Sequence, residues 1–263
     1  MKHFLAAAIL TLLAPFAQKT APGNLSQQAA GSAVLNDDQY IEQVLYKATG
    51  LLYNQADDGA MHMRCTVTAI EKTPKGYIFV TAAHCVGSDD TEKERVKPDK
   101  TYFFITSDSD GGSKDFMKAK LLAAGYQHES DDFALLEVET DQQFPLIAVG
   151  EDVADHSGQP IVNVASPLGL GKQTFKGIVS SPRLARPVVE GDINWTQAMA
   201  IQLFGANGGS SGSAIICLKQ RAICGFLVGT IGGTNTIAIQ VSRFKAFRLL
   251  VAEGKYEYFK PKK

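Results

Sequence analysis

The amino-acid sequence predicts an all-β fold that ends in one short helix. Short apolar runs typical of strands follow one another, and turn residues such as those at 73–76 separate them. These runs are 51–53, 65–70, 77–83, 102–105, 119–123, 133–138, 160–165 and 174–180. Near the end, apolar residues recur at helical spacing, and we expect Ser242 to cap this helix and Gly254 to end it. Its apolar face holds Phe244, Phe247, Leu250 and Val251.

The stretch 205–214 directs the functional interpretation, because it holds four glycines within eight residues, followed by an apolar run. Such a density of glycine indicates unusual backbone angles or close approach by another molecule. A serine in this loop, Ser211, becomes a nucleophile if the surrounding backbone N–H groups point at one spot and form an oxyanion hole. Because serine alone is inert, the hypothesis requires a base and an orienting acid elsewhere.

Candidates for both lie upstream of the loop. His84 ends one strand-like run and Asp132 opens another, so the chain order is His84, Asp132, Ser211. An α/β-hydrolase has the order serine, acid, histidine. Its nucleophile motif is G-x-S-x-G, whereas this loop reads G-x-S-G-S, with Ser213 at the position of the second glycine. Both facts argue against that fold, and Asp131 remains a second candidate for the acid.

Three motifs resemble those of the trypsin-like (chymotrypsin-fold) serine protease superfamily, over roughly residues 44–252. They are T-A-A-H-C around His84, D-F-A-L-L from Asp132, and G-x-S-G-x around Ser211. The segments 166–180 and 238–244 are similar to HtrA-type proteases, and glutamyl endopeptidases share the G-x-S-G-S form. The resemblance implies two antiparallel six-stranded β-barrels (chymotrypsin-like) with a short C-terminal helix. It favours Asp132 over Asp131, since the family places its acid immediately before the strand.

The chain begins with a short positive start and the apolar run 4–14, which together predict a secretory signal peptide. Residues 18–36 are rich in Gln, Ala, Ser and Gly, as flexible leaders are, and Asn36 is placed to cap a short helix. The expected organisation is a signal peptide (1–17), a leader with a short helix (18–43), a first barrel (44–150), a second barrel with the helix (151–253) and a basic tail (254–263).

Four cysteines in a secreted chain suggest two disulfides, for which three pairings exist. A predicted hairpin brings Cys65 close to Cys85, and a second predicted hairpin lies between Cys217 and Cys224. We therefore predict Cys65–Cys85 and Cys217–Cys224.

Composition argues against several partners. The net charge is −1 without a polybasic stripe, which argues against nucleic acid. No membrane-spanning segment is expected after the signal peptide. A CxxC metal motif is absent. We expect a secreted or periplasmic monomer that acts on polypeptides without cofactor or metal ion.

The resemblance implies roles for individual residues. His84 acts as general base, Asp132 orients it, and the N–H groups of Gly209 and Ser211 form the oxyanion hole. Ser210 stands where many relatives carry an aspartate that receives a newly cut N-terminus. We therefore expect no activation by terminal insertion, and the loop must be held by other contacts.

The resemblance also places the pocket for the P1 residue of a substrate. Its expected lining is Gly205, Ala206, Asn207, Thr230, Ile231 and Gly232. No carboxylate lies near the base of this pocket, so we expect a preference for small or medium apolar P1 residues. Thr230 replaces the histidine of glutamyl endopeptidases and is a candidate hydrogen-bond partner for the buried Asp132. Two alternatives stay open: a catalytically silent binding protein on this scaffold, or an esterase with the same triad.

Overall fold

The computed structural model describes residues 35–87, 102–107, 115–126, 130–153, 157–190, 193–231 and 235–254. The predicted signal peptide, most of the predicted leader and the predicted tail after residue 254 lie outside these residues, as does Gly232.

Six antiparallel strands form a first closed barrel, in the order β1-β2-β3-β6-β5-β4. They are β1 (Thr49–Gln55), β2 (Met61–Thr73), β3 (Gly76–Thr81), β4 (Tyr102–Thr106), β5 (Met117–Ala124) and β6 (Ala134–Glu139). Pairing of β1 with β4 closes the barrel, because Leu52 lies opposite Ile105. A closed barrel has no unpaired strand edge that could recruit another chain.

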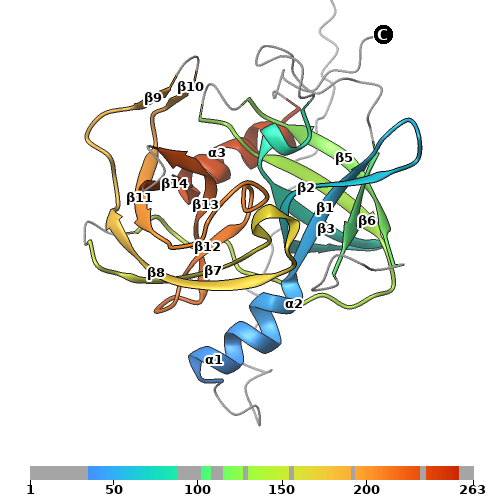
Figure 1. Cartoon of the computed structure of the whole chain (residues 1–263), viewed down its shortest axis with the longest axis horizontal. Helices are drawn as coiled ribbons and strands as arrows, with labels where there is room; N and C mark the ends of the chain where they lie inside the picture. Colours follow the sequence, from blue (N-terminus) through green and yellow to red (C-terminus); the bar gives the residue numbers. More distant parts are fainter. Residues whose placement is uncertain are drawn as a thin grey trace, which may run out of the picture. The chain divides into compact units, whose positions relative to one another are not determined.

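A second closed barrel follows, in the order β11-β14-β13-β12-β7-β8 (Figure 1). Its strands are β7 (Pro160–Ala165), β8 (Gln173–Ser181), β11 (Ala198–Gln202), β12 (Ala214–Cys217), β13 (Ala222–Ile231) and β14 (Asn235–Gln240). The prediction of two six-stranded antiparallel barrels is confirmed. The sequence did not reveal a small separate hairpin, β9 (Val188–Glu190) with β10 (Ile193–Trp195), between β8 and β11.

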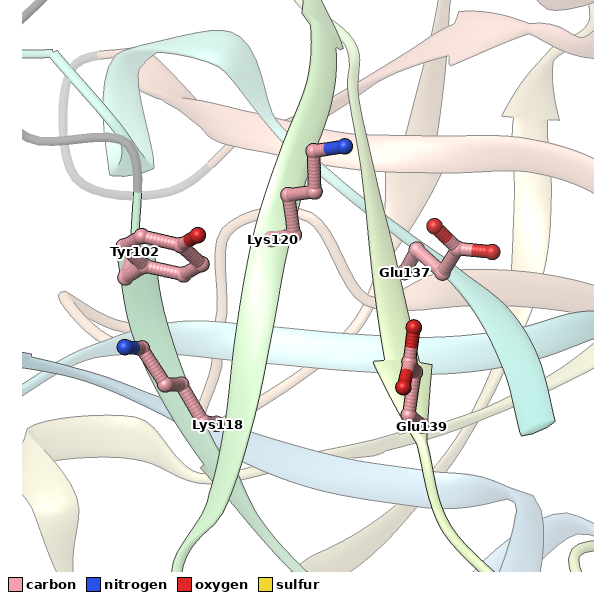
Figure 2. A pocket seen from close by; sticks show the side chains of 5 residues that line it. All are labelled: Tyr102, Lys118, Lys120, Glu137 and Glu139. Atoms are coloured by element: carbon pink, nitrogen blue, oxygen red, sulfur yellow. The ribbon is translucent and has the colours of Figure 1, made fainter. Parts of the chain in front are cut away.

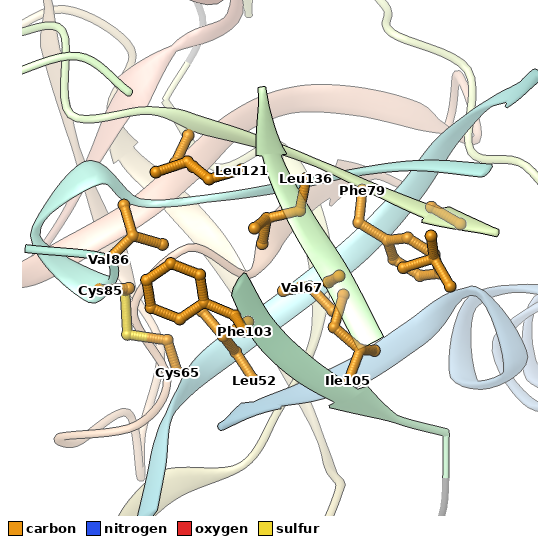
Figure 3. Close-up of a cluster of buried hydrophobic side chains, with 14 of the residues drawn as sticks. Leu52, Cys65, Val67, Phe79, Cys85, Val86, Phe103, Ile105, Leu121 and Leu136 are labelled. Atoms are coloured by element: carbon orange, nitrogen blue, oxygen red, sulfur yellow. A yellow bond between two sulfur atoms is a disulfide. The ribbon is translucent and has the colours of Figure 1, made fainter. Parts of the chain in front are cut away.

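The interior of the first barrel is filled by side chains from alternate positions of its strands (Figure 3). The ring of Phe144, from the segment after β6, forms T-shaped contacts with the rings of Tyr77 and Phe79, with centroids 5.3 and 5.2 Å apart. Each large apolar side chain that is fully buried contributes about 1.5–3 kcal/mol to folding relative to an exposed position. This core supports the end of β3, where the predicted histidine turn begins.

The outer face of the same barrel carries the strand residues whose side chains point away from the interior. A pocket on this face is lined by Tyr102, Lys118, Lys120, Glu137 and Glu139 (Figure 2). The Lys118 ammonium lies 3.7 Å from the centre of the Tyr102 ring, and Lys120 lies opposite Glu137 in the strand register. Such cross-strand pairs stabilise a sheet surface, so these charges have a structural explanation.

A short helical segment precedes the first barrel, as the sequence predicts. It comprises α1 (Asp37–Tyr40), a π-helical turn (Ile41–Leu45) and α2 (Tyr46–Ala48). Asn36 caps α1, because its side chain accepts from the Gln39 N–H while the Gln39 side chain accepts from the Asn36 N–H. At the other end, the buried Lys172 ammonium donates to the carbonyl oxygens of Tyr46 and Thr49, over 2.8 and 3.1 Å. Lys172 thereby ties the end of the helical segment to the loop before β8.

The C-terminal helix α3 spans Val241–Ala252. The prediction that Ser242 caps it is wrong, because the N-cap is Gln240 and Ser242 already lies in the first turn. The backbone N–H of Ser242 instead donates to the Asp152 carboxylate over 2.8 Å, which satisfies a free N–H of the first turn from outside the helix. Gly254 follows the helix with a φ of +65°, as expected of a residue that ends a helix.

Within the described part of the chain, no helix combines the length and apolar character needed to cross a membrane.

Candidate active site

Both predicted disulfides are present, and one of them fixes the histidine turn. Cys65 on β2 is bonded to Cys85, which lies in the 3₁₀ turn η2 (Ala83–Cys85) directly after His84. Cys217 at the end of β12 is bonded to Cys224 on β13 across the hairpin between them. The first bridge ties the backbone of the predicted base to a central strand of the first barrel.

His84 and Asp132 form a close pair. His84 Nδ1 lies 2.7 Å from Asp132 Oδ2, and the backbone N–H of His84 donates to Asp132 Oδ1 over 2.9 Å. The Asp132 side chain is fully buried, whereas a quarter of the His84 side chain is exposed. A carboxylate at Nδ1 orients the imidazole and leaves Nε2 as the ring nitrogen that accepts a proton.

Opposing effects set the pKa of His84. Burial disfavours the imidazolium and is the largest single contribution, and it lowers the pKa. The charge of Asp132 and its hydrogen bond act in the other direction, while the Arg64 guanidinium lowers the pKa again. The balance raises the pKa of His84 above the ordinary value of 6.5.

Asp131 has a different partner from Asp132. Arg243 on α3 forms an ion pair with Asp131, with Nε 2.6 Å from Oδ1. On the other side, Ser130 has a φ of +64°, and its hydroxyl donates to the Asn194 carbonyl oxygen in β10 over 3.1 Å. The structure thus brings Asp132, and not Asp131, to His84.

The aromatic ring of Phe133 anchors Asp132 from the following position. Phe133 is fully buried, and three other rings, from β13 and α3, surround it. They are Phe226, Phe244 and Phe247, with centroids 5.5, 5.2 and 5.7 Å away. Helix α3 therefore supports the aspartate through Phe244 and Phe247 as well as through Arg243.

The Ser211 loop is in contact with the residues that precede His84. Gly212 has a φ of +79°, and a Cβ atom at this position would lie 2.5 Å from Ala82 N and 2.8 Å from Thr81 Cα. The Ser211 carbonyl oxygen accepts from the Thr66 N–H over 3.1 Å, beside Cys65. In the described part of the chain, Ser211 Oγ and His84 Nε2 are not joined by a hydrogen bond; such bonds are often long in an enzyme without substrate.

Two backbone N–H groups of the loop, those of Gly209 and Ser211, point away from the hydrogen-bonded carbonyl oxygens of their own peptide groups. The Gly208 carbonyl oxygen accepts from the Leu168 N–H over 2.6 Å, so the Gly209 N–H of the same trans peptide points the opposite way. The Ser210 carbonyl oxygen is bound likewise, and the Ser211 N–H points away from it. Neither N–H has an acceptor among the described residues, and free N–H groups of this kind can bind an anion.

Hydrogen bonds between uncharged, buried groups hold the Ser211 loop. Ser213 Oγ donates to the Ser210 carbonyl oxygen over 2.7 Å, and Asn163 Nδ2 donates to Ser213 Oγ over 2.8 Å. All three residues are fully buried, and we call them the Ser210 network. The sequence did not identify Asn163, although a polar residue inside the apolar run 160–165 was a usable signal. Ser210 is uncharged and cannot form an ion pair with a chain terminus. The hydrogen bonds of the Ser210 network are contacts of another kind that hold the loop, as the sequence led us to expect.

The predicted P1 pocket residues lie at one end of the second barrel. Ile201 on β11 pairs with Thr236 on β14, which in turn pairs with Thr230 on β13. The segment 205–207 follows β11, so it begins near the end of β13 that carries Thr230. Gly205 has a φ of +92°, and a Cβ atom there would lie 2.7 Å from the ring of Phe175. The sequence did not identify Phe175 as a neighbour of this segment.

The remaining pocket residues differ in exposure. Asn207 Oδ1 accepts from the Gly208 N–H over 2.8 Å, and Ala206 packs against the core of the second barrel. Thr230 is exposed and Ile231 is half-buried. Among the described residues, both hydrogen bonds of the Asp132 side chain are with His84, so the suggested hydrogen bond between Thr230 and Asp132 is wrong.

Comparison with known proteins agrees with this geometry. The family model of the trypsin-like peptidase domain matches residues 66–225, a span that includes His84, Asp132 and Ser211. No curated protein matches the chain. The family match covers more than half of the 263 residues. The chain therefore belongs to the trypsin-like peptidase domain family.

Proposed function

We propose that the chain is a serine endopeptidase that hydrolyses peptide bonds through His84, Asp132 and Ser211. One observation carries the proposal: the buried Asp132 carboxylate binds two nitrogens of His84, and the Ser211 loop lies against the turn that carries this histidine. Membership of the peptidase family supports a polypeptide substrate.

The proposed reaction is acyl transfer in two halves. Ser211 Oγ attacks the scissile carbonyl carbon while His84 Nε2 takes its proton, and the carbonyl oxygen becomes an oxyanion between the N–H groups of Gly209 and Ser211. Loss of one such donor costs about 3 kcal/mol of transition-state stabilisation. The C–N bond then breaks as His84 returns the proton to the leaving amine. Water repeats the sequence on the acyl-enzyme and releases the acid.

We also propose that small or medium apolar side chains are preferred at P1. The support is the apolar surroundings of Gly205, which lies on the ring of Phe175, and the neighbouring Ala206. Neither a carboxylate nor an imidazole belongs to the described residues expected to line the pocket. A peptide-library profile dominated by cleavage after Arg, Lys or Glu would contradict this preference.

The cellular location belongs to the same proposal. Disulfides persist in oxidising compartments, and this chain has two of them. With the expected signal peptide at 1–17, they support a secreted or periplasmic enzyme. Sequencing the N-terminus of protein recovered from the medium or periplasm tests this, and protein recovered only from the cytosol with residue 1 intact would contradict it.

The central experiment is labelling with a fluorophosphonate probe, followed by mass spectrometry of the adduct. We expect the label on Ser211, its loss in His84→Ala, and its retention in His62→Ala, a matched change at an exposed histidine. Folded protein that stays unlabelled would contradict the proposal and favour a silent binding protein. Hydrolysis of a simple ester without cleavage of casein would favour an esterase.

A further inference from the structure

We propose that Thr66 is a positioning residue for this reaction, because it holds the backbone of the Ser211 loop in the arrangement that presents the Gly209 and Ser211 N–H groups. The inference rests on the proposed function and adds a residue to it. Thr66 lies on β2 directly after Cys65, and its side chain is fully buried.

The Thr66 hydroxyl is engaged as a donor and as an acceptor. It donates to the Gly209 carbonyl oxygen over 2.9 Å, and it accepts from the Ser166 N–H over 3.1 Å. A threonine hydroxyl offers one proton and two lone pairs, so one side chain serves both backbone groups. Valine has almost the same shape and would leave both groups without these partners.

The backbone of Thr66 adds two more contacts. Its N–H donates to the Ser211 carbonyl oxygen over 3.1 Å, and its carbonyl oxygen accepts from the Thr81 hydroxyl over 2.8 Å. Thr81 ends β3, close to His84. Thr66 is therefore fixed relative to the histidine turn while it binds the serine loop.

The peptide groups of the loop alternate in role. Thr66 binds the carbonyl oxygens of Gly209 and Ser211, which belong to every second peptide group. The peptide group between them supplies the Ser211 N–H, and the peptide group just before them supplies the Gly209 N–H of the proposed oxyanion hole. Because each peptide is planar and shares a Cα atom with the next, fixing one plane restricts its neighbour. Through Ser166, Thr66 also steadies the segment in which Leu168 binds Gly208.

The same strand provides a matched control. Thr68 lies two positions further along β2 and is also buried, but its hydroxyl has no hydrogen-bond partner in the described part of the chain. Thr66→Val and Thr68→Val therefore make the same chemical change in the same barrel. Only the first removes a contact to the loop. Thr66→Ser keeps the hydroxyl and tests whether it is the hydroxyl that matters.

The experiment measures kcat and KM on a peptide substrate, inhibition by a peptide aldehyde, and thermal unfolding of the full-length variants. The aldehyde tests the oxyanion hole, since addition of Ser211 Oγ converts its carbonyl oxygen into an oxyanion. Because deleting one oxyanion donor lowers kcat by about 10²–10³, we expect misplacement in Thr66→Val to lower kcat about 10- to 100-fold. Aldehyde affinity falls in proportion, and KM changes less than about threefold. Thr66→Ser restores most of kcat, and Thr68→Val leaves it unchanged.

Several outcomes would overturn the assignment. Equal kcat in Thr66→Val and the wild type, equal losses in Thr66→Val and Thr68→Val, or failure of Thr66→Ser to restore kcat would each do so. If Thr66→Val does not fold, Thr66→Ala is judged by the same criteria. A folded wild type that the fluorophosphonate does not label would overturn the proposed function and this assignment with it. A labelled wild type with unaffected Thr66 variants would overturn the assignment alone.

Discussion

Gly212→Ala is the most direct test of the contact between the Ser211 loop and the histidine turn. Gly212 follows the proposed nucleophile with a φ of +79°, a region that costs a residue with a Cβ atom about 1–2 kcal/mol. The new Cβ would also lie 2.5 Å from Ala82 N, whereas ordinary contact begins at 3.4 Å. The two segments must therefore separate by about 0.9 Å, the difference between these distances.

The size of both effects follows from this displacement. Overpacking of this kind costs about 1–3 kcal/mol. With the backbone term, the free energy of unfolding falls by about 2–5 kcal/mol, which for a chain of this size lowers Tm by about 10 °C. Because Ala82 lies two residues before His84, the base and nucleophile move apart. A misplacement of about 1 Å costs about 10²-fold in rate.

The assay compares Tm with the rate of fluorophosphonate labelling, and Gly158→Ala is the control. Gly158 has a φ of +86°, but a Cβ atom there would meet nothing within 4 Å. It should carry only the backbone cost of about 1–2 kcal/mol, with an unchanged labelling rate. If both variants lose the same stability and Gly212→Ala is labelled as fast as the wild type, the loop does not press against the histidine turn and the reasoning fails.

Three further predictions address other parts of the structure. In Asp132→Asn, the carboxylate charge that raises the pKa of His84 is gone, while burial and Arg64 still lower it, so that pKa falls. Since only neutral His84 accepts a proton, the acid limb of kcat/KM against pH moves to lower pH, and kcat falls by about 10⁴. An acid limb that stays in place would show that another group controls it. Lys172→Met removes the ammonium that binds two carbonyl oxygens at the end of the helical segment. We expect the free energy of unfolding to fall by about 2–3 kcal/mol and amide exchange to become faster in residues 37–48. Unchanged exchange would show that the helical segment does not depend on Lys172. Replacing Cys65 and Cys85 together by serine opens a link across 20 residues and should lower the free energy of unfolding by about 3 kcal/mol in a denaturant titration; a loss under about 1 kcal/mol would contradict this.

The sequence was sufficient for the parts of the molecule that local rules govern. Most strand runs, the turn at 73–76 and the cap at Asn36 depend on residues close in sequence and were predicted, whereas β9, β10 and β11 were not. The candidates His84, Asp132 and Ser211 were identified because their chemistry tolerates few residue types next to recognisable strands. These assignments still await the labelling experiment.

The parts that the sequence could not supply depend on partners far along the chain. Thr66 binds Ser166, which is 100 residues away, and Asn163 binds Ser213, which is 50 residues away. In a sequence, each is one more polar residue in a strand. The Ser242 error has the same origin, because the helix begins earlier than predicted, with its N-cap at Gln240, and Asp152, at a separation of 90 residues, binds the Ser242 N–H of its first turn.

The chemistry of the Ser210 network bears on behaviour in alkaline solution. A loop held by an α-amino group loses its support as that amine, with a pKa of about 8, gives up its proton. Amide, hydroxyl and carbonyl groups such as those of Asn163, Ser213 and Ser210 do not ionise in this range, so we expect their contacts to be the same at pH 7 and pH 10. Because Ser210 is uncharged and its carbonyl oxygen is bound by Ser213, we expect extra residues fused ahead of the N-terminus to leave the loop intact. We therefore propose that the conformation of the Ser211 loop is set when the chain folds, without a later cleavage or the loss of a proton.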